Sequence, residues 1–169
     1  MPAREIQICG DVAFVPLTQG LVAIIDASDA PLAAFHNWCA TINKSVTYAV
    51  RSASKDEPNH RARILLHRVI MSAPDDLLVD HINGDGLDCR RANMRLATFA
   101  ENARNQRRRI TNTSGFKGVS YVKESGKWQA RIRFAGAREN LGYFATREEA
   151  SAAYVEASKR LHGEFSRTV

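Results

Sequence analysis

The 169-residue chain lacks the features that define several large protein classes. It contains no apolar run of the roughly 18 residues that a membrane-spanning helix needs, and no charged-then-apolar leader. Cysteine is scarce, with three residues and no CxxC pair, so we expect neither a disulfide framework nor a structural zinc site. The 44% hydrophobic and 25% charged residues are typical of a globular protein. We therefore expect a cytoplasmic protein with no membrane partner, and no feature indicates an obligate protein partner.

Positive charge is unevenly spread along the chain. Residues 1–102 hold 10 Lys and Arg against 12 Asp and Glu, whereas residues 103–169 hold 14 against 6. Between Arg104 and Arg138 there are ten basic residues and one acid, Glu124. This asymmetry favours a polyanionic partner, most simply double-stranded DNA. A solvated basic face is the alternative.

The apolar patterns and turn signals predict an α+β protein. Short strands and one helix dominate the start of the chain, where "VAFVPLTQGLVAIID" predicts a hairpin around residues 18–20 and no motif indicates a role. A strand–loop–strand–helix segment follows, then a basic linker, then three strands and a final helix. A second T-x-x-E capping box, of Thr146 and Glu149, predicts the start of that helix. Its apolar face is predicted by the helical spacing of Ala150, Ala153, Tyr154, Ala157 and Leu161. The expected segments are a β-rich region at 1–62, the strand–loop–strand–helix unit at 63–106, the linker at 107–114, and a three-stranded antiparallel sheet packed on one helix at 115–169.

The second segment carries the residues that point to chemistry. "LLVDH" and "MRLA" are expected strands around the turn-rich "INGDGLDCRRAN", and a T-x-x-E capping box of Thr98 and Glu101 predicts a helix start. If the strands pair as a hairpin, that helix folds back and brings Asn102 towards Asp80. Two such oxygen ligands suit one Mg²⁺ or Mn²⁺ ion. Beside that ion, His81 can take a proton from a water aimed at phosphorus.

Each of these residues also has a plain structural interpretation. An Asp-His pair is common in turns and salt bridges, Asn93 can hold a loop through backbone hydrogen bonds, and Asn102 alone fits an exposed helix position. The catalytic interpretation depends on their occurring together and in this order.

That order resembles the HNH homing endonucleases, the ββα-metal nucleases. The resemblance covers residues 63–106, through "LHRVIM", "VDHINGDGLDCRRANMRLAT" and "ENARN". It implies that His81 is the general base, that Asn93 ties the loop holding it, and that Asp80 and Asn102 are ligands of one divalent metal. His67 also looks like a recurrent family feature, either structural or contacting phosphate. Cys89 stands where family members often carry Asn, which leaves the loop geometry in question.

The third segment predicts a sheet with two different faces. In "GKWQARIRF", Gln129, Arg131 and Arg133 alternate with apolar neighbours, so one face would pack on the Ala-rich helix and the other would be basic. Trp128 and Phe134 belong to the expected apolar face. Such a basic sheet fits a major groove, and an ordinary solvated face is the alternative.

The same segment resembles the APETALA/ethylene-response-factor (ERF) DNA-binding domain, through G-V, G-K-W-x-A-x-I, L-G-x-F, T-x-E-E-A and A-x-x-L-x-G-E-F. In that family the sheet lies in the major groove. Ser120, Arg131 and Asn140 depart from the plant pattern, so the plant target sequence does not carry over. The positions matched to DNA contacts are Lys117, Ser120, Arg131, Arg133, Arg138 and Asn140, and we expect the basic linker to contact phosphates or the minor groove through Arg104, Arg107, Arg108 and Arg109.

The sequence thus predicts a metal-dependent DNA endonuclease. Its resemblance to the HNH homing endonucleases alone implies a homing role in a phage or another mobile element, in a bacterial or phage-infected cell. The alternative is a sequence-specific DNA-binding regulator with a vestigial nuclease unit.

Overall fold

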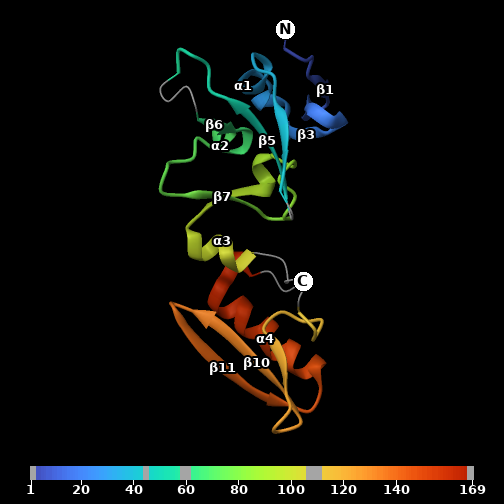
Figure 1. The fold of residues 1–169 in the computed structure, drawn as a ribbon, viewed down its shortest axis with the longest axis vertical. Coiled ribbons are helices and arrows are strands. Elements are labelled where there is room, and N and C mark those ends of the chain that lie inside the picture. Colours follow the sequence, from blue (N-terminus) through green and yellow to red (C-terminus); the bar gives the residue numbers. More distant parts are fainter. Residues whose placement is uncertain (1–2, 44–45, 58–61, 106–111, 167–169) are drawn as a thin grey trace. The chain divides into compact units, whose positions relative to one another are not determined.

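The computed structural model describes residues 3–43, 46–57, 62–105 and 112–166. They fall into two compact units, residues 1–99 and residues 100–169 (Figure 1). The predicted α+β class is confirmed, since helices and small antiparallel sheets alternate in both units. Among the described residues, no helix is long and apolar enough to cross a membrane.

The first unit begins with a three-stranded antiparallel sheet in the order β1-β2-β3. Residues alternate between buried and half-buried along β2, because successive side chains of a strand point to opposite faces. The expected hairpin is present, and a short 3-10 turn at Thr18–Gly20 joins its strands. The strands are β1 Gln7–Cys9, β2 Val12–Pro16 and β3 Val22–Asp26.

A second sheet, in the order β4-β5-β6, and two one-turn helices complete the N-terminal half of this unit. Pro31 lies in the first turn of α1, where its missing N–H breaks no helical hydrogen bond. The strands are β4 Cys39–Ile42, β5 Thr47–Ser52 and β6 Arg63–Leu65. The helices are α1 Ala30–Ala34 and α2 Leu66–Ile70, the latter following β6 directly.

The strand–loop–strand–helix order of the second predicted segment is also present. β7 (Leu78–His81) pairs antiparallel with β8 (Met94–Ala97), and α3 (Phe99–Asn105) begins immediately after Thr98. A 3-10 turn at Arg91–Asn93 leads into β8.

One hydrophobic core runs through the whole first unit. Trp38, Ile25 and Leu66 are almost completely buried in it, and Cys89 and Met94 from the β7–β8 region join them. The expected boundary between residues 62 and 63 stays a prediction. The two segments on either side of it nevertheless pack around the same core.

Besides most of α3, the second unit contains a three-stranded antiparallel sheet, in the order β11-β10-β9, packed against one long helix. The helix α4 (Arg147–His162) starts with the predicted capping box of Thr146 and Glu149, and Gly163 ends it with a φ of 53°. The buried face of α4 includes Ala150, Tyr154 and Ala157, as its spacing predicts. The strands are β9 Val119–Val122, β10 Lys127–Phe134 and β11 Ala137–Phe144.

Candidate active site

Asp80 is fixed by a partner across the β7–β8 hairpin. The register places Asp80 opposite Arg95, whose Nε and Nη2 donate to Asp80 Oδ2 at 2.9 and 2.8 Å. Both side chains are largely buried, at 4% exposure for Asp80 and 12% for Arg95. A guanidinium that grips one oxygen of a carboxylate orients the other, as the partners of metal ligands commonly do.

His81 faces a different set of neighbours from Asp80, as expected for adjacent residues of a strand. Its ring centroid lies 5.1 Å from that of His67 and 5.9 Å from that of Tyr48, and its Nε2 is 3.9 Å from Cys89 Sγ. Burial lowers the pKa of His81, although the carboxylates of nearby aspartates, first among them Asp80, oppose this shift. The neutral imidazole, which can accept a proton, is therefore the main form at neutral pH.

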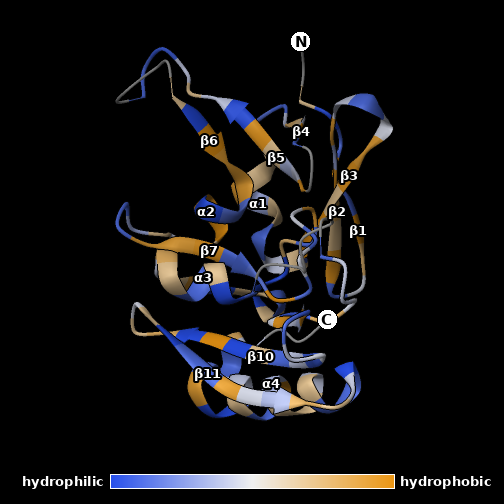
Figure 2. Ribbon diagram, turned by 60° about the horizontal axis from the view of Figure 1, so that its bottom comes forward, coloured by the Kyte–Doolittle hydropathy of each residue, from blue (hydrophilic) through white to orange (hydrophobic). Residues whose placement is uncertain are grey.

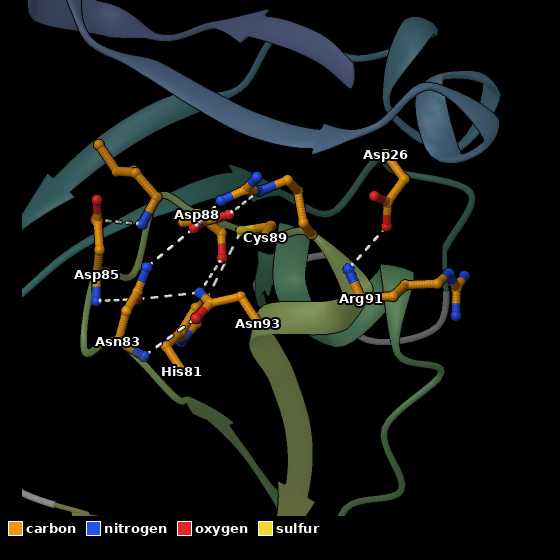
Figure 3. A network of polar contacts seen from close by, with 10 residues as sticks. Asp26, His81, Asn83, Asp85, Asp88, Cys89, Arg91 and Asn93 are labelled. Atoms are coloured by element: carbon orange, nitrogen blue, oxygen red, sulfur yellow. Dashed lines mark hydrogen bonds and ion pairs between the residues drawn. The ribbon is translucent and has the colours of Figure 1, made fainter. Parts of the chain in front are cut away.

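Asn93 closes the loop that follows His81. Its Oδ1 accepts a hydrogen bond from the backbone N–H of Asn83 at 3.1 Å, and its Nδ2 donates to Asn83 Oδ1 and to the carbonyl of Asp88. Its own carbonyl accepts from the Ile82 N–H at 2.8 Å. Figure 3 shows Asn93 at the centre of these contacts. Three side-chain bonds from one amide therefore tie both ends of the loop together, as the sequence predicts for this residue.

Charged pairs further brace the same loop. Asp88 accepts two hydrogen bonds from Arg90, both at 2.7 Å, and one from Asn83 Nδ2 at 2.9 Å. Arg90 and Asn83 hold the pKa of the Asp88 carboxyl below its ordinary value. Arg91 makes a two-pronged ion pair with Asp29, at 2.8 and 2.9 Å. The loop is thus a rigid element rather than an open turn.

The loop is also bound to the N-terminal sheet. The Ile24 N–H donates to the carbonyl of Leu87, and the Cys89 N–H donates to the carbonyl of Ile24, at 2.8 and 2.7 Å. Cys89 is completely buried, and burial raises the pKa of its thiol to about 12. The protonated thiol acts as a core residue.

His67 lies on α2, with 6% exposure. Its Nδ1 is buried and has no hydrogen-bond partner among the described residues. Burial, with smaller effects from His81 and Arg68, lowers the pKa of His67 to about 3. The ring is therefore uncharged at neutral pH, so any contact of His67 with phosphate would rely on a hydrogen bond rather than on charge.

The two expected metal ligands belong to different units, Asp80 to the first and Asn102, half-buried on α3, to the second. Their pairing therefore stays a prediction. Among the described residues no group of three or more His, Cys, Asp or Glu side chains could hold a metal ion. The donor set still fits Mg²⁺, because that ion binds through one or two protein oxygens and completes its shell with water and substrate phosphate oxygens.

The outer face of the C-terminal sheet presents the expected basic residues. Arg131, Arg133 and Arg138 are all exposed, and β10 is banded orange and blue along its length in Figure 2. Arg131 pairs with Asn140 through a register shift between Ala130 and Arg131, and Arg133 pairs with Arg138. The five residues predicted on these three strands, Ser120, Arg131, Arg133, Arg138 and Asn140, therefore belong to one sheet.

Gln129 departs from its predicted place on a solvated face. It is 7% exposed, and its Nε2 donates to Asn140 Oδ1 at 3.1 Å and to the Tyr143 hydroxyl at 3.0 Å. The Gly142 N–H also donates to Asn140 Oδ1, at 3.3 Å. Because Asn140 Oδ1 already accepts these two hydrogen bonds, the Nδ2 amino group of Asn140 is the part of its side chain that can donate to a bound ligand.

Phe134 departs from its predicted place on the buried apolar face. It is 38% exposed and lies outside the helix–sheet core, with its ring centroid 6.3 Å from that of His162 at the end of α4. The Arg104 guanidinium lies 5.5 Å above its ring, a cation–π contact. Lys117 is also engaged within the protein, since its Nζ donates to the Arg104 carbonyl at 2.6 Å. The linker residues Arg107, Arg108 and Arg109 lie outside the described residues.

Two residues at the site were not predicted from the sequence. Arg95 ends the pattern R-x-N-x-R formed by residues 91–95, and the register of the β7–β8 hairpin places it opposite Asp80. Tyr48 gave no comparable signal, because its contact with His81 joins residues far apart in the chain.

A family model described as HNH endonuclease matches residues 65–104. Protein 3.8 of Escherichia phage T7 is 35% identical over 96 residues, which cover 56% of this chain and 77% of that protein. An uncharacterized HNH endonuclease, L560, of Acanthamoeba polyphaga mimivirus is 30% identical over 110 residues, or 62% of this chain and 56% of that protein. No solved structure matches the chain. The chain therefore belongs to the family of phage T7 protein 3.8, and its residues 65–104 form an HNH endonuclease domain.

Proposed function

We propose that the protein is a metal-dependent DNA endonuclease that hydrolyses phosphodiester bonds, with His81 as its general base. The observation that carries this proposal is the placement of His81, a buried imidazole that follows Asp80 on β7 and precedes the loop closed by Asn93. A neutral imidazole accepts the proton of a water molecule as that water attacks phosphorus. The HNH endonuclease match over residues 65–104 supports the reaction class.

The neighbouring residues have supporting roles in this proposal. Asn93 holds the loop so that His81 keeps one position, and Arg95 aims the Asp80 carboxylate. Asp80 and Asn102 would hold one Mg²⁺ or Mn²⁺ ion, which supplies positive charge to the phosphate and to the departing oxygen. His67 packs against His81, and its uncharged ring favours the structural role over a phosphate contact.

The C-terminal sheet is proposed to read double-stranded DNA in the major groove, as its likeness to the APETALA/ERF domain implies. Support comes from the exposed guanidinium groups of Arg131, Arg133 and Arg138 and from the Asn140 amino group. All of these are hydrogen-bond donors, which suit the acceptor atoms on base edges. Ser120 and Lys117 belong to the same proposed surface, and Arg104 with the linker residues Arg107, Arg108 and Arg109 would contact phosphates.

A homing-type role in a phage or other mobile element is part of the proposal. The resemblance to HNH homing endonucleases implies the homing role, and the phage T7 relative supports the phage setting. The cytoplasm of an infected bacterial cell is the corresponding proposed location.

The test is cleavage of supercoiled plasmid with and without Mg²⁺, by the wild type and by His81→Ala. We expect nicked or linear product only with metal. His81→Ala should cleave roughly 100- to 10,000-fold more slowly and bind DNA as before. Binding without metal-dependent cleavage by the wild type would favour the DNA-binding regulator instead.

A further inference from the structure

Three aromatic rings from different parts of the first unit meet at His81. Tyr48 comes from β5, His67 from α2 and His81 from β7. The ring centroids of Tyr48 and His67 are 5.1 Å apart, and each ring also contacts His81, at 5.9 Å for Tyr48 and 5.1 Å for His67. Tyr48 lies in the N-terminal β-rich region, outside residues 65–104 that the HNH model matches. A residue from that region therefore borders the proposed general base.

The loop after His81 closes over Tyr48 as well. A Cβ on Gly86 would overlap the Tyr48 ring and the carbonyl of Thr47, so only glycine allows the loop to lie this close to β5. Cys89, whose Sγ is 3.6 Å from the Gly86 carbonyl and 3.9 Å from His81 Nε2, fills the space between the loop and the imidazole. Tyr48 is thus packed between the loop and the two histidines.

The orientation of a histidine ring depends on such neighbours. Its χ2 torsion has a broad, roughly two-fold profile, so the side chain alone does not fix the plane of the ring. His67 meets His81 edge to face at 89°, and Tyr48 meets it at 45°. With both rings in place, the imidazole of His81 has one well-packed orientation.

We infer that Tyr48 is a positioning residue for His81, through which the N-terminal region takes part in DNA cleavage. This inference rests on the proposed function. The ring of Tyr48, rather than its hydroxyl, keeps the His81 imidazole in the plane in which it meets the attacking water. Catalysis is sensitive to such placement, since a shift of about 1 Å can lower a rate roughly 100-fold.

The test compares Tyr48→Leu, which removes the ring, with Tyr48→Phe, which keeps it, in the full-length chain with Mg²⁺ and plasmid DNA. We expect Tyr48→Leu to lower kcat roughly 10- to 100-fold with KM and metal dependence unchanged, and Tyr48→Phe to restore most of the activity. The NMR signals of the His81 ring protons should move in Tyr48→Leu and stay near their wild-type positions in Tyr48→Phe. Phe35→Leu, at a site 84% exposed in the same unit, is the matched control for loss of a ring.

Two results would overturn the inference: activity of Tyr48→Leu within threefold of wild type, or an equal loss in Tyr48→Phe. Should Tyr48→Leu not fold, Tyr48→Met takes its place with the same thresholds, since methionine adapts to irregular space. The double variant with His81→Ala should be no slower than His81→Ala alone, because Tyr48 acts through His81. Undiminished cleavage by His81→Ala would refute the proposed function, whereas a loss there without a loss in Tyr48→Leu would refute only the inference.

Discussion

The two units hold their functional side chains in opposite ways. In the first unit, Asp80 and His81 are 4% and 5% exposed and are surrounded by specific partners. In the second unit, the three sheet arginines project from an exposed surface, and Gln129 is the buried member that orients Asn140. The first arrangement suits chemistry, which needs fixed geometry and dry surroundings, and the second suits contact with a large, charged surface.

This difference leads to different expectations for substitutions in the two units. Changes in the first unit should alter stability and cleavage rate together, because the same contacts serve both. Changes on the sheet face of the second unit should alter DNA binding and leave stability nearly intact.

The largest expected effect comes from Arg95 of the first unit, and Arg133 of the second unit is its matched control. Arg95→Ala removes the guanidinium that pairs with the buried Asp80 carboxylate, and breaking a buried pair in this way costs about 3–5 kcal/mol of unfolding free energy. Arg133→Ala, on the exposed face of β10, should change that free energy by no more than about 0.5 kcal/mol. Urea unfolding followed by circular dichroism measures both. Similar losses in the two variants would contradict the contrast between the units.

A matched pair of asparagines tests the same contrast through activity. Asn93→Ala removes three side-chain hydrogen bonds that close the loop, so kcat should fall roughly 100-fold with DNA affinity unchanged. Asn140→Ala should keep the cleavage rate on non-specific DNA and lose only part of the sequence preference. Single-turnover cleavage together with binding titrations separates the two effects. A fall in kcat for Asn140→Ala would mean that the two units are not separable in function.

Loss of site preference is the next effect in size. Replacing Arg131, Arg133 and Arg138 together should remove about 1–3 kcal/mol of discrimination for each arginine that reads a base. Replacing Arg107, Arg108 and Arg109 should weaken binding to all sequences alike and lower the slope of the salt dependence by about one for each arginine that binds a phosphate. A binding selection on randomised DNA at two salt concentrations measures both sets. If the variant of the three sheet arginines keeps the DNA sequence preference of the wild type, this face of the sheet does not read bases.

The smallest expected effect concerns thiol chemistry in the first unit. Cys9 and Cys39 are exposed, whereas Cys89 is buried with a pKa raised to about 12. Because the thiolate is the reactive form, Cys89 should stay unlabelled by iodoacetamide at about pH 8 while the other two react. Mass spectrometry of native and urea-unfolded protein gives the comparison. Rapid labelling of native Cys89 would show that the loop opens readily.

Local patterns predicted much of this structure. The capping box at Thr146, the β7–β8 strands and the three C-terminal strands all depend on neighbouring residues, and each is present. The spacing of Ala150, Tyr154 and Ala157 predicted the buried face of α4 for the same reason. Periodicity is a local property, so one sequence is enough to reveal it.

Contacts between distant residues could not be predicted in this way. Tyr48 meets His81 only because β5, α2 and β7 pack around one core, and no pattern near Tyr48 indicates this. The alternating pattern of β10 places Gln129 on the polar face. Its amide nevertheless donates a hydrogen bond to Asn140 on the neighbouring strand, next to the register shift between β10 and β11. Phe134 continues an apolar pattern, yet it stays partly exposed at the end of β10, where it meets His162 at the end of α4.

The shared core of the first unit also limits how such a protein can be recombined. Ile24 is hydrogen-bonded to the loop that carries Cys89, and Tyr48 packs on the same loop, so a gene fusion that begins at residue 63 would discard both supports. A junction after Asn105, where α3 ends, instead keeps the core, the HNH match at residues 65–104 and Asn102 together. An exchange of the proposed DNA-reading segments between related proteins should therefore succeed when residues 1–105 are kept as one block. The catalytic motif alone is too short to be the portable unit.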